Sequence, residues 1–258
     1  TIGKELSHIE NAQLQDVKNF FFKHYRPTNA ILCVAGNITT ERVKELAEKW
    51  FEPIEPGIKY ERKLQPEPQQ NEARKLVVEK DVPVSVIMKA YHIVDRLNSN
   101  YYTADLITEL FSGGQSSRLY QKLVKEKQLF SQIDCYHTGS VEQGLLVVEG
   151  KILPNINPED ADKAIQEEIQ NLLDKQVESS ELEKVKNKIE SMISFEDLGL
   201  LSRANNLAFY ELLGDAEKMN HEFSNYSKVT AEEIQTQAKI IFDENNSNTL
   251  YYLAKSKN

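Results

Sequence analysis

The chain has 258 residues, enough for one large or two modest domains with a core that needs no disulfide. Its 31 Lys and Arg residues stand against 40 Asp and Glu residues, giving a net charge of -9. This acidity argues against nucleic acid and anionic membranes as partners. No apolar run approaches the ~18 residues of a membrane span, and nothing in the sequence indicates a compartment.

The first fifty residues predict a helix, a strand and a second helix. Residues 11–24 carry apolar side chains at helical spacing, and a second helix with the same pattern ends at Phe51. Between them, residues 30–35 (AILCVA) form a continuous apolar run, which predicts a strand buried on both faces. One buried strand cannot form a sheet. We therefore expect residues 1–52 to be the C-terminal part of a domain whose other strands lie upstream or on another chain.

Residues 53–71 predict an extended linker. They hold four of the eight prolines, with many charges between them. This composition places a domain boundary between the first block and residues 72–258.

Residues 72–258 predict a complete domain in which pairs of strands alternate with helices. This order indicates an α+β fold, with an antiparallel-rich sheet and helices packed on one face. The expected strands are residues 74–80, 84–91, 130–137, 144–153 and 249–254. The expected helices begin at Asn98 or Ser99, at Ser117, at Asn157-Pro158, at a Ser180–Glu183 capping box, near Phe195 (ending at Gly214) and at a Thr230–Glu233 capping box.

The histidines do not form a metal-binding pattern. No two of the five are three or four residues apart, and the HxxEH pattern is absent. His221-Glu222 begins like a zinc motif, but Asn225 stands where the second histidine would be. We predict no metal ligand and no catalytic residue in this chain.

Two further sets of polar side chains have simple structural explanations. Cys33 and Cys135 each lie in an apolar strand-like run, which favours two buried free thiols. Lys184, Lys186 and Lys188 alternate with glutamates, which predicts a solvated helix face.

Residues 111–136 contain the chain's only Gly-Gly pair, Gly113-Gly114, followed by Ser116-Ser117. The stretch lacks the Lys-Ser/Thr ending of a phosphate loop and the G-x-S-x-G context of a serine nucleophile. A glycine pair between two helical patterns indicates an unusual φ or a close backbone approach. We expect Ser116 to cap the helix that follows.

Two segments together resemble a known family. Residues 24–38 read HYRPTNAILCVAGNI, and residues 111–129 read FSGGQSSRLYQKLVKEKQL. They are similar to the strand and helix starts of the insulinase, pitrilysin and mitochondrial processing peptidase family of zinc metallopeptidases. The resemblance extends over essentially the whole chain. The matching positions are Tyr25, Pro27, Asn29 and Gly36 in the first segment, and Gly113, Gly114, Ser116, Ser117, Arg118, Leu119 and Tyr120 in the second.

The resemblance implies two homologous halves that close around an extended peptide. In the family, the HxxEH motif and its distant Glu ligand lie in the N-terminal half. Residues 1–52 would then be the end of a zinc-bearing half, and residues 72–258 a complete opposing half-domain of the processing-peptidase type. No cofactor is expected in this chain, whereas zinc is expected in the intact protein or in a partner.

The resemblance also indicates positions that face the substrate. Many relatives carry an Arg and, seven residues later, a Tyr that contact the peptide near the scissile bond. The matching register places Val124 and Ser131 there, and neither supplies a cationic fork or a phenol donor. Together with Arg118, these are the positions that we expect to face the substrate.

Three functional hypotheses follow. In the first, the chain is the C-terminal portion of a zinc metallopeptidase-like protein and positions a peptide or protein substrate for an upstream or partner zinc-bearing half. It would then hold no zinc and have no peptidase activity alone. In the second, it belongs to a non-catalytic paralogue, a structural or substrate-holding subunit, as the residues at Val124 and Ser131 suggest. The third, a free-standing binding module, is disfavoured because residues 1–52 cannot complete a sheet.

Overall fold

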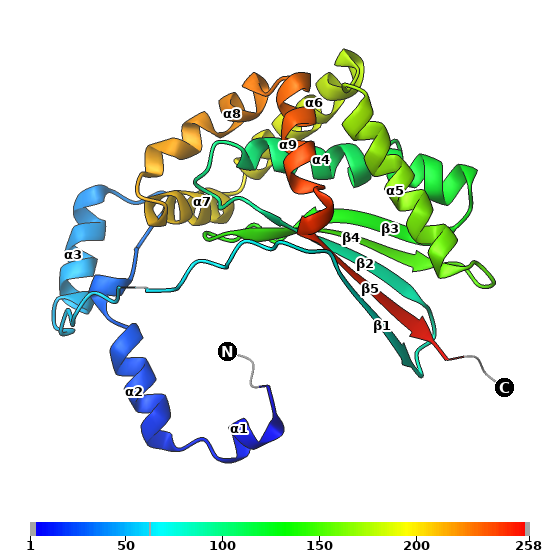
Figure 1. The fold of residues 1–258 in the computed structure, drawn as a ribbon. Helices are drawn as coiled ribbons and strands as arrows, with labels where there is room; N and C mark the ends of the chain where they lie inside the picture. Colours follow the sequence, from blue (N-terminus) through cyan, green and yellow to red (C-terminus); the bar gives the residue numbers. More distant parts are fainter. Residues whose placement is uncertain (1–3, 62, 256–258) are drawn as a thin grey trace. The chain divides into compact units, whose positions relative to one another are not determined.

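The computed structural model describes residues 4–61 and 63–255 (Figure 1). The chain divides into two compact units, one made of residues 1–65 with 196–219 and the other of residues 66–195 with 220–258. None of the helices in the described ranges is both long and apolar enough to cross a membrane.

The first unit is helical. Thr39 caps α3 by accepting a hydrogen bond from the backbone N–H of Arg42. No residue of α2 or α3 is buried, although both helices are amphipathic. The helices are α1 (Leu6–Glu10), α2 (Leu14–His24), α3 (Thr40–Phe51) and α7 (Leu200–Leu212), with a 3-10 turn at Pro27–Asn29.

Residues 30–35, predicted as a buried strand, form no strand in the structure. Their side chains are exposed, except that of Cys33, which is half-buried. A strand needs a neighbour to bond its backbone, and no segment of the described residues pairs with this one. The strand prediction is therefore wrong here, and so is the prediction that Cys33 is a buried thiol.

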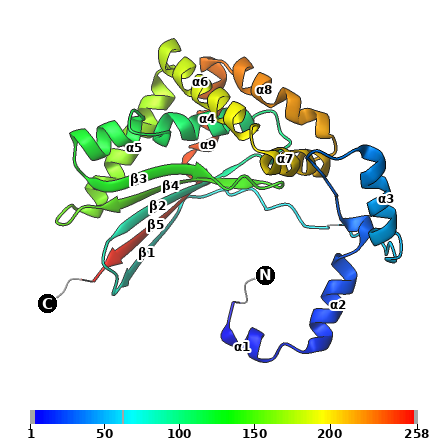
Figure 2. The ribbon, with the colours of Figure 1, turned by 180° about the vertical axis from the view of Figure 1, so that it is seen from behind.

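The second unit is a five-stranded mixed sheet in the order β1-β5-β2-β4-β3. β1 and β5 are parallel, and the other three pairings are antiparallel. The helices of this unit cover one face of the sheet and leave the other face without a helix (Figures 1 and 2). The strands are β1 (Arg74–Lys80), β2 (Val86–Ile93), β3 (Phe130–His137), β4 (Gly144–Ile152) and β5 (Ser247–Ala254).

The helices of the second unit follow most of the predicted boundaries. Asn157 and the Thr230–Glu233 box cap α5 and α9 as predicted. Its helices are α4 (Tyr101–Ser112), α5 (Pro158–Asp174), α6 (Ser179–Glu196), α8 (Glu222–Lys228) and α9 (Ala231–Ile241), with a π-helix η2 (Tyr120–Glu126) and a 3-10 turn η4 (Glu244–Asn246). A further 3-10 turn, η3 (Ala216–His221), spans the sequence boundary between the two units.

Two helix starts differ from the prediction. Ser180 and Glu183 do not form a capping box, because α6 already includes Ser179 and its first carbonyl acceptor is that of Glu178. The start predicted near Phe195 is also wrong, because α6 runs through that residue and α7 begins only after Gly199. The predicted end before Gly214 is confirmed, since α7 ends at Leu212.

The core lies between the sheet and the helix layer. Along the central strand β2, Ile87, Lys89, Tyr91 and Ile93 alternate toward the helices and are buried. Lys89 is the polar exception, and its ammonium bonds Asp162 Oδ1 of α5 at 2.8 Å. A buried charge is tolerated only when it is paired, so this ion pair fixes α5 over the middle of the sheet.

Candidate functional site

The Gly113-Gly114 pair ends α4 and permits a sharp turn. A Cβ atom on Gly113 would overlap the backbone carbonyl of Glu109, and Gly114 has φ +116°. Both reasons predicted for the glycines, a close approach and an unusual φ, are confirmed. Ser116 does not cap the next helix; the first carbonyl acceptor is that of Ser117, which bonds the N–H of Gln121 at 3.0 Å.

The lysines of α6 hold this turn in place. Lys188 Nζ bonds Glu109 Oε2 at 2.6 Å and the carbonyl of Gly113 at 2.9 Å. Lys184 donates to the carbonyl of Ser116 at 3.2 Å. The prediction of a simply solvated lysine face is therefore wrong: the long side chains cross to carbonyls at the ends of neighbouring segments, where cations are favoured.

The three positions expected to face a substrate lie in different surroundings. Arg118 makes a two-point ion pair with Glu181, with Nε–Oε1 at 2.9 Å and Nη2–Oε2 at 2.6 Å. Val124 lies on η2, half-buried against the core. Ser131 is exposed on β3 and donates to the carbonyl of Lys151 at 3.3 Å. Of the three, only Ser131 lines the small cavity of 240 Å³ beside the glycine turn.

Strand β3 is an edge of the sheet and presents backbone groups outward. The hydroxyl of Ser112 takes up both outward groups of Cys135, donating to its carbonyl at 2.7 Å and accepting from its N–H at 2.8 Å. Outward groups recur at every second residue of an antiparallel strand, so those of Ile133 point the same way. No strand of the described residues pairs with β3 on that side.

An Asp–His pair in this unit resembles an acid–base pair but is fully engaged. Asp105 binds His137 Nε2 at 2.8 Å and accepts from the Tyr226 hydroxyl at 2.7 Å. The other ring nitrogen of His137 accepts from the N–H of Gly139 at 3.0 Å. Neither nitrogen is left to exchange a proton with a ligand, so the pair is structural.

The electrostatics of Asp105 agree with that role. Burial alone would raise the pKa of its carboxyl, but the hydrogen bonds from His137 and Tyr226 and the nearby Arg96 hold the pKa below its ordinary value. The same burial, next to the ionised Asp105, raises the pKa of the Tyr226 phenol.

The described residues contain no group of three or more His, Cys, Asp or Glu side chains that could hold a metal ion. Zinc in a peptidase needs three protein ligands with an open fourth position. The residues present therefore do not fit a catalytic zinc site, and no step of hydrolysis can be derived from them.

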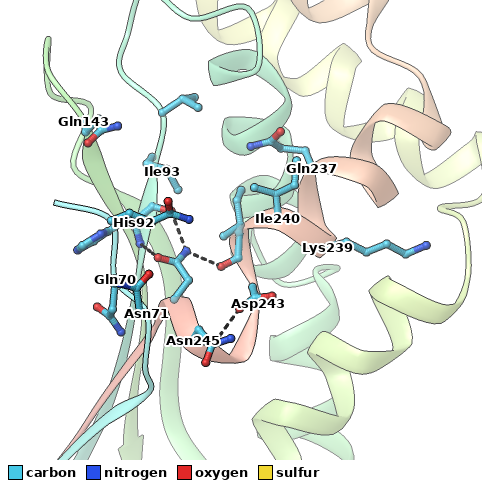
Figure 3. A pocket seen from close by; sticks show the side chains of 14 residues that line it. Gln70, Asn71, His92, Ile93, Gln143, Gln237, Lys239, Ile240, Asp243 and Asn245 are labelled. Atoms are coloured by element: carbon cyan, nitrogen blue, oxygen red, sulfur yellow. Dashed lines mark hydrogen bonds between the residues drawn. The ribbon is translucent and has the colours of Figure 1, made fainter. Parts of the chain in front are cut away.

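The largest cavity that we describe lies at the ends of β2 and α9 (Figure 3). It measures about 630 Å³, within the usual range of ligand pockets. Its walls are rich in carboxamides, a feature that we did not predict. The signals were the pairs Gln69-Gln70 and Asn245-Asn246, which composition alone assigns to a linker and a turn. The lining residues are Gln69, Gln70, Asn71, His92, Ile93, Val94, Gln143, Gln237, Lys239, Ile240, Ile241, Asp243, Asn245 and Asn246.

Comparison with known proteins gives relatives of one kind. A family model described as the peptidase M16 inactive domain matches residues 11–189. The chain is 30% identical over 191 residues to the zinc protease PqqE of Helicobacter pylori, covering 70% of this chain and 41% of that protein. It is 24% identical over 230 residues to the uncharacterized zinc protease YmxG of Bacillus subtilis, covering 88% and 55%. The chain thus spans about half the length of these relatives.

Solved structures share the fold. A crystal structure of a protease from Helicobacter pylori matches with a TM-score of 0.87 at 24% identity, covering 96% of this chain and 61% of that one. The peptidase M16 inactive domain from Pseudomonas fluorescens matches with a TM-score of 0.83 at 17% identity, covering 98% and 60%. The predicted α+β fold is confirmed.

Sheet order, helix layer and structural matches together define an α+β fold that this chain shares with the peptidase M16 inactive-domain structure. The chain belongs to the peptidase M16 inactive-domain family. The resemblance to zinc metallopeptidases, drawn from the segments around Tyr25 and Gly113, is thereby confirmed.

Proposed function

We propose that this chain encloses and positions a peptide or protein substrate, while a zinc-bearing half, upstream or on a partner chain, cleaves it. The observation that carries the proposal is the match of residues 11–189 to an inactive domain of a peptidase family.

In this proposal the chain has three parts. Residues 1–52 form the end of a zinc-bearing type of half-domain, residues 53–71 link the halves, and residues 72–258 form the complete non-zinc half. The exposed apolar side chains of α2, such as Phe20 and Phe21, support the first part, because a helix of this kind needs a partner for its apolar face.

The edge of β3 is the surface that we propose for the substrate. An extended peptide can add to an edge strand through main-chain hydrogen bonds. Ile133 has outward groups for such pairing, and Ser112 closes the edge at Cys135. Ser131 lies at the irregular start of the strand, where the register shifts between Phe130 and Gln132. Val124 would act indirectly, through the position of η2, and Arg118 would act indirectly through its ion pair with Glu181.

The first experiment tests the chain alone for zinc and for activity. We expect no stoichiometric zinc by metal analysis and no peptide hydrolysis that a chelator abolishes. Stoichiometric zinc with chelator-sensitive hydrolysis would show that the chain is itself an enzyme.

The second experiment tests where peptide binds. A photo-cross-linking amino acid is placed at Ser131 on β3 or, as a matched control, at the exposed Lys75 on the opposite edge strand β1. With a tryptic digest of casein, we expect peptide adducts at Ser131 and none at Lys75. Equal labelling at both positions, or none at Ser131, would contradict the proposed surface.

A non-catalytic paralogue is the second candidate. Val124 and Ser131 favour it, because neither supplies the donors that many relatives have there. Upstream sequence discriminates between the two: an intact HxxEH motif favours the enzyme, and a degraded one favours the paralogue.

A further inference from the structure

The amide-lined cavity begins where the sheet pairing between β2 and β5 stops. The last ladder partners are Tyr91 of β2 and Ser247 of β5. Beyond them β5 has not yet begun, and the turn η4 occupies the space beside His92. The edge of β2 that β5 would otherwise cover is therefore open to the cavity from this point onward (Figure 3).

At His92 a side chain replaces the missing strand. The carboxamide of Asn246 accepts from the N–H of His92 at 3.2 Å and donates to its carbonyl at 3.0 Å. The same NH₂ group donates to the carbonyl of Ile241 at 2.8 Å. A primary carboxamide presents the same donor and acceptor as a peptide group, so Asn246 shows which chemistry this edge accepts.

The next residue on the same side has no such partner. The β2 backbone groups that face β5 recur at every second residue, so those of Val94 point the same way as those of His92. No hydrogen bond to the N–H or the carbonyl of Val94 comes from the described residues. Val94 directly follows the last residue of β2 and lines the cavity, and its backbone offers one donor and one acceptor.

Gln237 supplies a second unpaired polar group. Its side chain comes from α9, is 4% exposed and lines the cavity. No group within residues 4–61 and 63–255 hydrogen-bonds to its carboxamide. The only fully buried side-chain atom left unpaired among the described residues is Ser117 Oγ, so the carboxamide of Gln237 is reached from the cavity, where a ligand can bond it. By contrast, Gln70 in the opposite wall is saturated by Glu72, Ser247 and Asn248.

We propose that this cavity binds a short extended peptide segment, which continues the sheet beside Val94 and bonds the carboxamide of Gln237. The main chain of the segment would take the position that β5 leaves empty. Its side chains would meet the apolar wall formed by Ile93, Ile240 and Ile241. The site is separate from the β3 edge and requires no zinc, so the inference goes beyond the proposed function.

The charges of the cavity favour a neutral segment. Its two charged residues are Lys239, whose side chain extends away from the other labelled residues in Figure 3, and Asp243, which accepts from the N–H of Asn245 at 2.9 Å. The remaining polar groups are carboxamides and His92. An ion would find no convergent counter-charge, whereas a peptide backbone finds alternating donors and acceptors.

The test uses the full chain and a capped neutral peptide, Ac-Ser-Val-Thr-Val-Ser-NH₂. A matched peptide carries N-methyl groups on its second and fourth residues, which removes backbone donors and keeps the side chains. We expect saturable shifts of the Val94 backbone and Gln237 side-chain NMR signals with the first peptide. The N-methylated peptide should bind at least tenfold more weakly. Equal binding of the two peptides, or no binding of either, would overturn the inference.

Two variants of α9 separate a ligand role from a structural role. Gln237→Met removes a carboxamide that has no partner in the fold, so we expect unchanged or higher stability and about fivefold weaker peptide binding. Gln235→Met is the control, because Gln235 donates to the carbonyl of Leu173 at 2.8 Å. We expect that control to lower Tm and leave binding unchanged. A loss of Tm without weaker binding in Gln237→Met would assign Gln237 to the fold.

The same spectra separate this inference from the proposed function. Shifts confined to residues 131–137 would place the peptide on the β3 edge, which supports substrate enclosure and overturns the cavity site. Shifts at Val94 and Gln237 alone would support the cavity site and leave β3 without support. Maltose serves as a probe for a carbohydrate ligand, which carboxamide side chains could also bind. Saturable binding of maltose without binding of the peptide would also overturn the inference.

Discussion

At the residue scale, the second unit relies on buried polar groups that are saturated by neighbours. Asp105 joins α4 to β3 through His137 and to α8 through Tyr226. Lys89 and Tyr251 both bond Asp162, so α5 is joined to two strands. Removing one member of such a network leaves a buried group unpaired, which costs more than the bond itself contributes.

Asp105 should make stability depend on pH. Because its folded pKa lies below the unfolded value of about 3.9, its ionised form stabilises the fold fully above that value. This contribution is lost as the pH falls through the folded pKa. We expect Asp105→Asn to be about 2 kcal/mol less stable than the parent at pH 7, with the difference shrinking below about pH 4.

Urea denaturation between pH 7 and pH 2.5 measures this difference. Asp160→Asn, at an exposed position of α5, is the control and should change stability little at any pH. A constant difference between the parent and Asp105→Asn across the whole range would show that the ionisation of Asp105 does not stabilise the fold.

At the element scale, the elements that depend on residues close together in the sequence were predicted correctly. The strand at residues 130–137 and the Thr230–Glu233 capping box depend on neighbouring residues, and both were predicted correctly. The break before α7 and the π-helix were not, because no local pattern distinguishes them from a regular helix. Residues 30–35 have the composition of a strand, but a strand forms only where another strand pairs with it.

The Arg118–Glu181 pair joins the residues just before η2 to α6. Its hydrogen bonds raise the pKa of Arg118, and both side chains are about four-fifths buried. A two-point guanidinium–carboxylate bond in this setting should contribute about 1 kcal/mol. We expect that coupling in a double-mutant cycle of Arg118→Met and Glu181→Gln, measured by urea denaturation.

The exposed pair Lys122–Glu126 on η2 is the matched control and should show much weaker coupling. Equal coupling in the two cycles would mean that the arrangement of Arg118 has no special structural value. Arg118 could then leave Glu181 at little cost in stability and contact the substrate, as the resemblance implied.

At the scale of the whole molecule, the two units differ in what they bury. The second unit holds the hydrophobic core, whereas α2 and α3 of the first unit have no buried residue. Elements with little buried apolar surface open at low free energy. The two units therefore should not unfold as one cooperative structure.

Trp50 reports on this difference, because it is the only tryptophan and lies on α3 with 63% of its surface exposed. In the chain of 258 residues we expect emission typical of a solvent-exposed indole, changing little with urea. Far-UV circular dichroism should show a separate cooperative transition. Coincident transitions of large amplitude in both signals would contradict the independence of the units.

The two candidate sites show the limit of sequence reasoning at this scale. The glycine turn was found because Gly113 and Gly114 form the chain's only such pair. The amide-lined cavity was not, because its walls join residues 69–71, 92–94 and 237–246. Asparagine and glutamine in turns are common, and only the fold shows that Gln237 remains unpaired while Asn246 does not.

The position of β5 has a consequence for how the chain folds. β5 lies between β1 and β2, so Arg74 finds its neighbour only at Asn248, far along the sequence. During synthesis β1 would remain unpaired until nearly all of these residues had been made, whereas β3 and β4 can pair early. Contacts of such long range slow folding and leave strand edges exposed to aggregation. A ribosome-bound intermediate without residues 247–254 would therefore leave β1 and one edge of β2 unpaired. We expect such an intermediate to bind chaperones.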